Sequence, residues 1–132
     1  MESIKRTLEM ESILRTLGCC EYDLVMLEVN KNITRNHRTE YMRNQVIRKR
    51  EKLILKIELL KNLIETYKTL EINEIDLAML EQDEKLMENL KSEYMIKCVE
   101  KCGENERKRL KEEIDELKNK IEDIDDAIYL MH

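Results

Sequence analysis

Large apolar side chains recur every three or four positions along most of the chain, the spacing that places them on one face of an α-helix. A run near the middle alternates steps of four and three, and its members are Leu53, Ile57, Leu60, Ile64 and Tyr67. Further apolar residues at 54, 55, 59 and 63 widen this face. A helix with so wide an apolar arc has to contact at least two neighbours. We therefore predict that these five residues form the internal core of a helical bundle.

The last segment has the most regular pattern. Apolar residues again alternate steps of four and three, at Leu110, Ile114, Leu117, Ile121, Ile124, Ile128 and Met131. This is a heptad repeat, and two oppositely charged pairs flank it, Glu113 with Lys118 and Lys120 with Asp125. Such pairs favour attraction between parallel helices. The pattern predicts a C-terminal coiled-coil helix over 106–130. We expect it to contact a partner through Ile114, Leu117, Ile121, Ile124 and Ile128.

The remaining boundaries come from breaks in the apolar phase. The stretch 30–39 is polar and indicates a loop, the phase slips over 70–76, and Gly103 indicates a helix end. The predicted helices are therefore 2–29, 38–69, 74–102 and 106–130. Because short joints favour antiparallel neighbours, we predict an all-α fold. It would be an elongated helical bundle, or antiparallel helical hairpins, with a C-terminal coiled-coil segment, forming a single domain over 1–132.

The first residues contain a near-duplication, since Met1–Leu8 recurs as Met10–Leu17 with one difference, Lys5 against Leu14. A shift of nine residues is half a turn at about 100° per residue, so the two copies face opposite sides of a helix. The second copy is in phase with the apolar residues that follow it. We interpret the duplication as accidental rather than as a helical repeat.

Composition supports helices and opposes sheet and disorder. The chain has no Pro and two Gly, so helix breakers and tight hairpin turns are scarce. Charged residues make up 40% and apolar residues 42%, and the regular apolar spacing argues against a disordered chain. No apolar run approaches the ~18 residues needed to span a bilayer. The charged N-terminus lacks the apolar core of a signal peptide. We expect an intracellular protein, cytoplasmic or nuclear, with no membrane partner.

Few residues of the chain suggest a catalytic, cofactor-binding or metal-binding site. Cys98 and Cys102 share a helix face, but structural zinc sites usually place cysteines in looped CxxC pairs. We expect Cys20, Cys98 and Cys102 to pack as small hydrophobes in apolar ridges. His37 and His132 have no suitably spaced Cys or carboxylate, and the scarcity of Gly opposes phosphate-binding loops. We therefore expect no enzyme activity, no cofactor and no metal.

Charge is unevenly distributed. Residues 31–52 carry eight Lys or Arg against two Glu, a net charge of +6, and include Arg43, Arg48, Lys49 and Arg50. One interpretation is that this basic segment folds against the acidic segment 71–93 in an antiparallel hairpin. The other is a nucleic-acid-binding surface. The chain lacks Phe and Trp, which would stack on bases, and this favours the first interpretation.

Long helical hairpins suggest one alternative function. The stretch Arg48–Tyr94 resembles a helix pair of tubulin-binding cofactor A in periodicity and charge. Prefoldin subunits are also long helical hairpins, but their glycine-containing β-hairpin has no counterpart over 70–105. The leading hypothesis is a structural or adaptor subunit that assembles with itself or a partner through coiled-coil and bundle packing. The alternatives are a small helical chaperone of unfolded clients or tubulin, and a nucleic-acid-binding helical protein.

Overall fold

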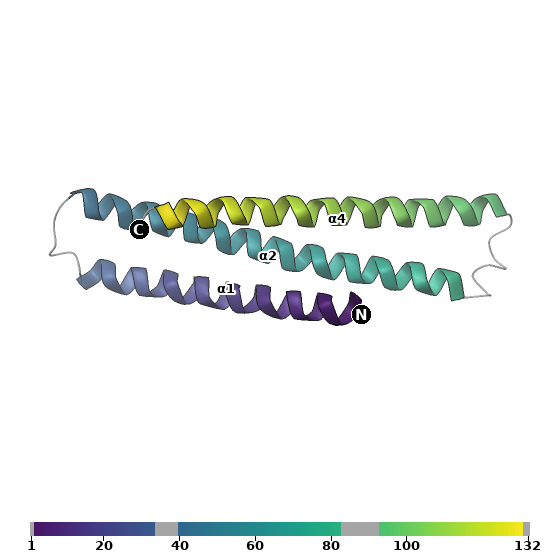
Figure 1. Ribbon diagram of the computed structural model, residues 1–132, viewed down its shortest axis with the longest axis horizontal. Helices are drawn as coiled ribbons and strands as arrows, with labels where there is room; N and C mark the ends of the chain where they lie inside the picture. The colour runs from purple at the N-terminus through teal and green to yellow at the C-terminus, as the bar shows by residue number, and fades with distance from the viewer. Residues whose placement is uncertain (1, 34–39, 83–92, 131–132) are drawn as a thin grey trace. The chain divides into compact units, whose positions relative to one another are not determined.

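The computed structural model describes residues 2–33, 40–82 and 93–130, and all of them are helical (Figure 1). Helix α1 spans Glu2–Ile33, α2 spans Glu40–Gln82 and α4 spans Glu93–Leu130. The all-α prediction is confirmed, and the helices pack against one another as in a bundle. None of the helices in these ranges is long and apolar enough to cross a membrane.

Two predicted joints are wrong, because the helices continue through them. α2 runs unbroken over the phase slip at 70–76, where no Pro or Gly interrupts it. Leu70 is buried there, and the Asn73 side chain donates a hydrogen bond to α4. The apolar pattern is therefore interrupted by a polar residue that still contacts α4, and the helix does not end there. α4 likewise runs through Gly103. The predicted loop at 30–39 falls mostly on residues 34–39, which lie outside the described residues.

Gly103 has a packing role in place of the predicted helix end. A Cβ atom added there would lie 2.3 Å from Leu77 Cδ2 and 3.2 Å from Leu77 Cγ. The missing side chain therefore gives Leu77 of α2 room to pack directly on the backbone of α4. A glycine inside a helix costs roughly 1 kcal/mol relative to alanine, and this contact offsets that cost.

The chain forms two compact units. Unit 1 comprises Met1–Ile64 and Leu117–His132, and unit 2 comprises Glu65–Glu116. The expectation of a single domain stays a prediction.

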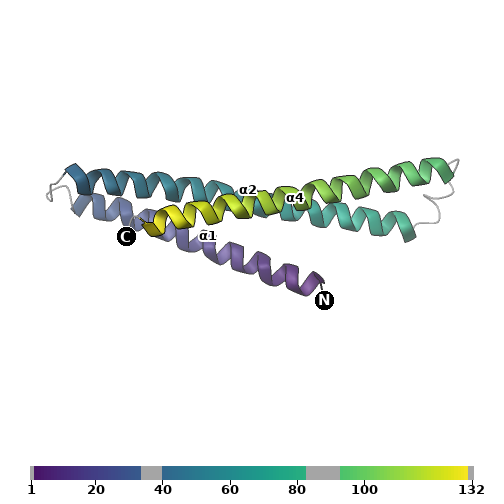
Figure 2. The same cartoon turned by 45° about the horizontal axis from the view of Figure 1, so that its top comes forward.

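Unit 1 contains α1, the first part of α2 and the last part of α4. Its core is a cluster of four buried residues, Cys20, Leu53, Ile57 and Leu60. Partly buried residues from α1 and α4 pack on this cluster: Ile13, Leu17, Leu24, Leu27, Ile121 and Ile128. α1 runs antiparallel to this part of α2, beside which it lies in both views (Figures 1 and 2).

Ion pairs connect the three helices of unit 1 around its core. Arg50 of α2 pairs with Glu28 of α1. Lys56 Nζ of α2 lies 2.5 Å from Asp125 Oδ1 of α4. Lys118 Nζ of α4 lies 3.9 Å from Glu9 Oε2 of α1. These contacts thus join each helix of unit 1 to both of the others.

Unit 2 is an antiparallel pair made from α2 and α4. Its buried residues include Thr66, Tyr67 and Leu70 on α2 and Leu110 and Ile114 on α4. Arg107 Nε also lies 3.1 Å from Glu74 Oε1 across the pair.

The predicted internal core is confirmed. Leu53, Ile57, Leu60 and Ile64 are buried in unit 1 and Tyr67 in unit 2, and none is more than 8% exposed. The apolar residues that widen this face differ in burial, since Leu63 is buried but Leu55 is exposed. The wide apolar arc is explained in unit 1 by the two neighbours of α2 there.

Candidate assembly surface

Helix α1 is apolar on two opposite sides. Its inner side carries Ile13, Leu17, Cys20, Leu24 and Leu27, which contribute to the core of unit 1. The opposite side carries exposed apolar side chains, which are Ile4, Leu8, Leu14, Tyr22, Val25, Met26 and Val29. At about 100° per residue these seven lie within about 70° of one direction. We call them, together with Gly18 on the same side, the outer face of α1.

The outer face is long and exposed. Its apolar side chains are between 38% and 64% exposed, and they extend over most of the helix. Exposed apolar residues scattered singly are normal, whereas several that share one side of a helix indicate a candidate interaction site. Glu11 and Arg15 also project on this side and pair with each other, Arg15 Nη2 lying 3.8 Å from Glu11 Oε2.

The two copies of the N-terminal duplication place apolar residues on opposite sides of α1. Ile4 and Leu8 of the first copy are 63% and 60% exposed, whereas Ile13 and Leu17 of the second pack on the core. The prediction that the copies face opposite sides is therefore confirmed. The outer face was not predicted from the sequence, because Glu11, Arg15 and Gly18 interrupt its apolar pattern. The four-and-three spacing of Leu8, Glu11, Arg15, Gly18, Tyr22, Val25 and Val29 was the available signal.

The residues predicted to contact a partner lie in contacts within the chain. Ile114, Leu117 and Ile124 are buried, and Ile121 and Ile128 pack on the core cluster of unit 1. The heptad pattern thus identified the packing face of α4 correctly. Contact of these residues with a partner, and coiled-coil assembly of α4, stay predictions.

The charges that flank this pattern also pair within the chain. Glu113 accepts a hydrogen bond from Arg109 of its own helix, 3.2 Å away. Lys118 pairs with Glu9, and Asp125 with Lys56. These three charges thus have partners within the chain, and their predicted pairing with the charges of a parallel partner helix stays a prediction.

A polar contact lies beside the apolar core of unit 1. Cys20 of α1 is 4% exposed, and the Lys56 side chain, 13% exposed, lies between it and Asp125. Burial raises the pKa of the Cys20 thiol, an effect that the positive charge of Lys56 only partly opposes. Burial is the largest effect on Lys56 and disfavours its charged form, but the hydrogen bonds and charge interactions with Asp125 and Cys20 together outweigh it, so the pKa of Lys56 is raised. A thiol that is buried and kept protonated is a poor nucleophile, which fits a structural role.

The prediction of packed cysteines is confirmed for Cys20 and wrong for Cys98 and Cys102. Both lie exposed on α4, as Cys19 does on α1. The ridge on which they were predicted advances by four residues at each step, which moves it about 40° around the helix each time. It therefore diverges from the buried seam of unit 2. No group of three or more His, Cys, Asp or Glu that could hold a metal is found among the described residues.

The predicted basic patch does not form a single surface. Arg43, Arg48 and Arg50 are exposed and Lys49 is half-buried. At about 100° per residue, Arg43 and Arg50 share one side of α2, while Arg48 and Lys49 point in two other directions. Arg50 is also engaged by Glu28. A groove that follows a phosphate backbone needs aligned charges, so this arrangement does not strengthen the nucleic-acid alternative.

The predicted hairpin between segments 31–52 and 71–93 is wrong. Residues 40–82 form one helix, so most of both segments lie along the same rod and cannot fold onto each other. The acidic residue Glu74 instead pairs with Arg107 of α4, and the basic residue Arg50 with Glu28 of α1.

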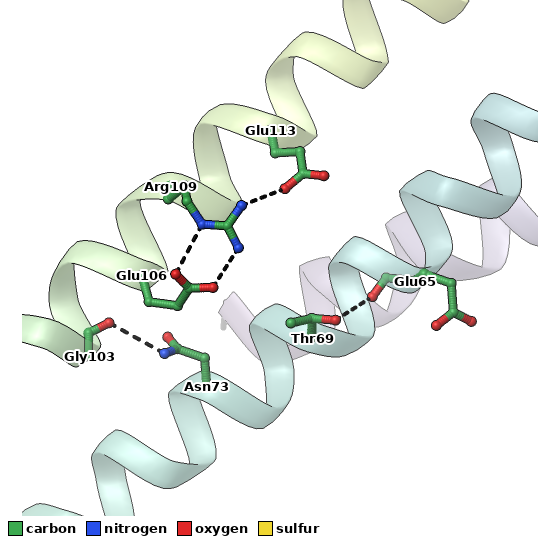
Figure 3. A network of polar contacts seen from close by, with 7 residues as sticks. All are labelled: Glu65, Thr69, Asn73, Gly103, Glu106, Arg109 and Glu113. Carbon is green, nitrogen blue, oxygen red and sulfur yellow. Dashed lines mark hydrogen bonds and ion pairs between the residues drawn. The ribbon is translucent and has the colours of Figure 1, made fainter.

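Unit 2 carries a polar network (Figure 3). Arg109 donates hydrogen bonds to both carboxylate oxygens of Glu106, at 3.0 and 2.6 Å, and to Glu113. These contacts lower the pKa of Glu106 and raise that of Arg109. Nearby, Asn73 Nδ2 donates to the carbonyl oxygen of Gly103 at 3.3 Å, while Asn73 Oδ1 is buried without a hydrogen-bond partner. These side chains join neighbouring turns and helices, as structural contacts do.

Comparison of the chain with protein-family models, with curated proteins and with solved structures finds no match.

Proposed function

We propose that this chain is a non-enzymatic structural or adaptor subunit that assembles with another helix through the outer face of α1. The observation that carries the proposal is that α1 is apolar on two sides, of which the described residues of its own chain cover one. A helix with two apolar sides needs a neighbour on each of them to remove both sides from water.

The energetics favour a covered outer face. Apolar burial contributes about 25 cal/mol for each Å² removed from water. Seven half-exposed aliphatic and aromatic side chains therefore offer several kcal/mol on docking, before the costs of association. The shape of the face favours a partner helix, because its residues recur at helical spacing and mesh best with a matching row.

The proposal is tested by affinity purification of the tagged chain from cells that make it naturally. The informative variant is Val25→Asp, which places a carboxylate on the outer face. The matched control is Ser12→Asp, which adds the same charge to α1 at an exposed position beside that face. We expect one stoichiometric protein, either another copy of this chain or one other species. Val25→Asp should lose it and Ser12→Asp should retain it.

Other outcomes would contradict the proposal. Equal retention by both variants would show that the outer face does not bind the partner. A mixed set of unrelated clients would favour the helical chaperone. Nucleic acid that co-purifies in a salt-sensitive manner would favour the nucleic-acid alternative, through Arg43, Arg48, Lys49 and Arg50.

A further inference from the structure

We infer that the occupant of the outer face of α1 is the same face of a second copy of this chain, packed antiparallel. The twofold axis would pass between residues 16 and 17. This inference rests on the proposed function and names the partner.

An antiparallel pair centred there brings into register the central row of the outer face, together with Glu11 and Arg15, while Leu14 and Met26 lie beside this row. Each layer joins one residue to a residue of the second copy, in the pairs Ile4 with Val29, Leu8 with Val25, Glu11 with Tyr22, and Arg15 with Gly18. The twofold axis repeats every layer once. Apolar layers therefore lie at both ends, and the two polar residues lie in the middle. A helix-in-groove contact of this kind is anchored by residues at helical spacing.

Charge repulsion disfavours a parallel pair in register more than it disfavours the antiparallel pair. A parallel pair in register would set Glu11 against Glu11 of the second copy and Arg15 against Arg15 of the second copy, and like charges in one layer repel. The antiparallel pair separates the two Glu11 side chains and places each near the hydroxyl of a Tyr22, which can donate a hydrogen bond to it. The two Arg15 side chains approach the axis, and each keeps a Glu11 of its own helix at 3.8 Å to balance its charge.

Gly18 supports close approach at the centre. A Cβ atom added to Gly18 would meet nothing within 4 Å, so packing inside the chain does not require this glycine. It nevertheless lies inside a helix, where glycine costs roughly 1 kcal/mol relative to alanine. In the antiparallel pair it lies opposite the long aliphatic stem of Arg15, for which the missing side chain leaves room.

The apolar area available on the outer face is close to what a standard dimer interface covers. If each of the seven apolar side chains loses on the order of 100 Å² of exposed surface, each copy covers about 700 Å². This approaches the ~800 Å² per partner of standard interfaces.

Disulfide trapping tests the pairing in the full-length chain. The background replaces the three exposed cysteines by serine (Cys19→Ser, Cys98→Ser, Cys102→Ser) and keeps the buried Cys20. One protein then carries Leu8→Cys and a second carries Val25→Cys, and the two are mixed in a glutathione redox buffer. Residues 8 and 25 of one helix are ~25 Å apart, so each can reach the other only in a second copy.

The control pair is Ser12→Cys mixed with Glu21→Cys. Both positions are exposed, and they lie at matched heights along the pair but to either side of the outer face. Because contact raises the effective concentration of two thiols to the millimolar range, we expect roughly tenfold more mixed dimer from Leu8→Cys with Val25→Cys than from the control pair.

Two results would overturn the inference. Preferential self-linking of Leu8→Cys would establish a parallel pair. Mixed dimer no more abundant than in the control would exclude this contact between copies. In the second case the proposed function would still stand if Val25→Asp lost a different stoichiometric protein and Ser12→Asp retained it.

Discussion

The two glycines of this chain have opposite surroundings, although both lie inside helices. Gly18 is exposed, with open space where a Cβ would project, whereas Gly103 packs beneath Leu77 of α2. Glycine identity alone suggested a helix end at Gly103, because the sequence does not indicate what approaches the glycine. Substitution by alanine separates backbone propensity from close packing at these two positions.

We expect Gly18→Ala to raise the free energy of unfolding by about 1 kcal/mol, since alanine favours the helix and meets no neighbour. Gly103→Ala gains the same helix propensity, but overpacking against Leu77 costs about 1–3 kcal/mol, so we expect a net loss. Urea unfolding in the Val25→Asp background, which keeps assembly out of the measurement, gives both values. Leu77→Ala should remove the penalty of Gly103→Ala. Equal gains at the two glycines would contradict the close contact.

Because the Cys20 thiol is buried, we expect the folded chain to lose stability at alkaline pH. Its pKa is raised in the folded chain above the ordinary value of 9.0. Between these two values the unfolded chain loses the proton and the folded chain keeps it, so the free energy of unfolding falls as pH rises above about 9. Lys56, also with a raised pKa, adds a loss at higher pH, beyond its ordinary value of 10.5.

Urea unfolding at pH 8 and pH 9.5 measures the thiol effect. We expect wild type to lose more stability over this interval than Cys20→Ala, which has no thiol to ionise. Cys19→Ala is the control, since Cys19 is exposed and should behave as wild type. The same decline in all three proteins would contradict a buried, protonated Cys20.

At the scale of the helices, the sequence indicated which side of a helix is buried more reliably than it indicated where a helix begins or ends. The four-and-three spacing from Leu110 to Ile128 identified the packing side of α4, because burial of that side depends only on periodicity. Helix ends depend on what approaches a position, as at Gly103 and Asn73. The fold class and the five core residues could therefore be predicted, while the length of α2 and the partners of its charges could not.

The outer face of α1 illustrates the same limit. Its apolar spacing is visible in the sequence, but a helix with two apolar sides gives no indication of which one its own chain covers. The covered side is the one with Ile13, Leu17, Cys20 and Leu24, because these residues pack against α2 and α4. Only the packed structure identifies the side with Tyr22 and Val25 as the free one.

Asn73 gives a prediction for the helix pair of unit 2. Its Oδ1 atom is buried without a partner, which costs about 1–3 kcal/mol, while its hydrogen bond to Gly103 returns about 1 kcal/mol. Leucine has a similar size and adds apolar burial. We expect Asn73→Leu to raise the free energy of unfolding by about 1 kcal/mol. Asn105→Leu, at an exposed position of α4, should leave it nearly unchanged. A loss of stability in Asn73→Leu would show that the hydrogen bond outweighs the buried oxygen.

At the scale of the whole molecule, substitution of Ile121 shows whether the last helix packs within its own chain or contacts a partner. It packs on the cluster of Cys20, Leu53, Ile57 and Leu60, so a carboxylate there should destabilise the isolated chain. We expect Ile121→Asp to lower the free energy of unfolding by about 2–4 kcal/mol, through lost apolar contacts and a partly buried charge. Tyr129→Asp, at a side chain that is 78% exposed, should change it by less than about 0.5 kcal/mol.

Chemical unfolding and light scattering on the same two variants distinguish the two roles of this helix. If Ile121 serves the fold, Ile121→Asp lowers the denaturant midpoint at every protein concentration, including dilutions at which the chain is monomeric. If Ile121 serves only a partner contact, the diluted variant unfolds like wild type and differs from it only in the mass of its assembly. The second pattern would require α4 to leave the core of unit 1, because one side of a helix cannot be buried in its own chain and in a partner at the same time.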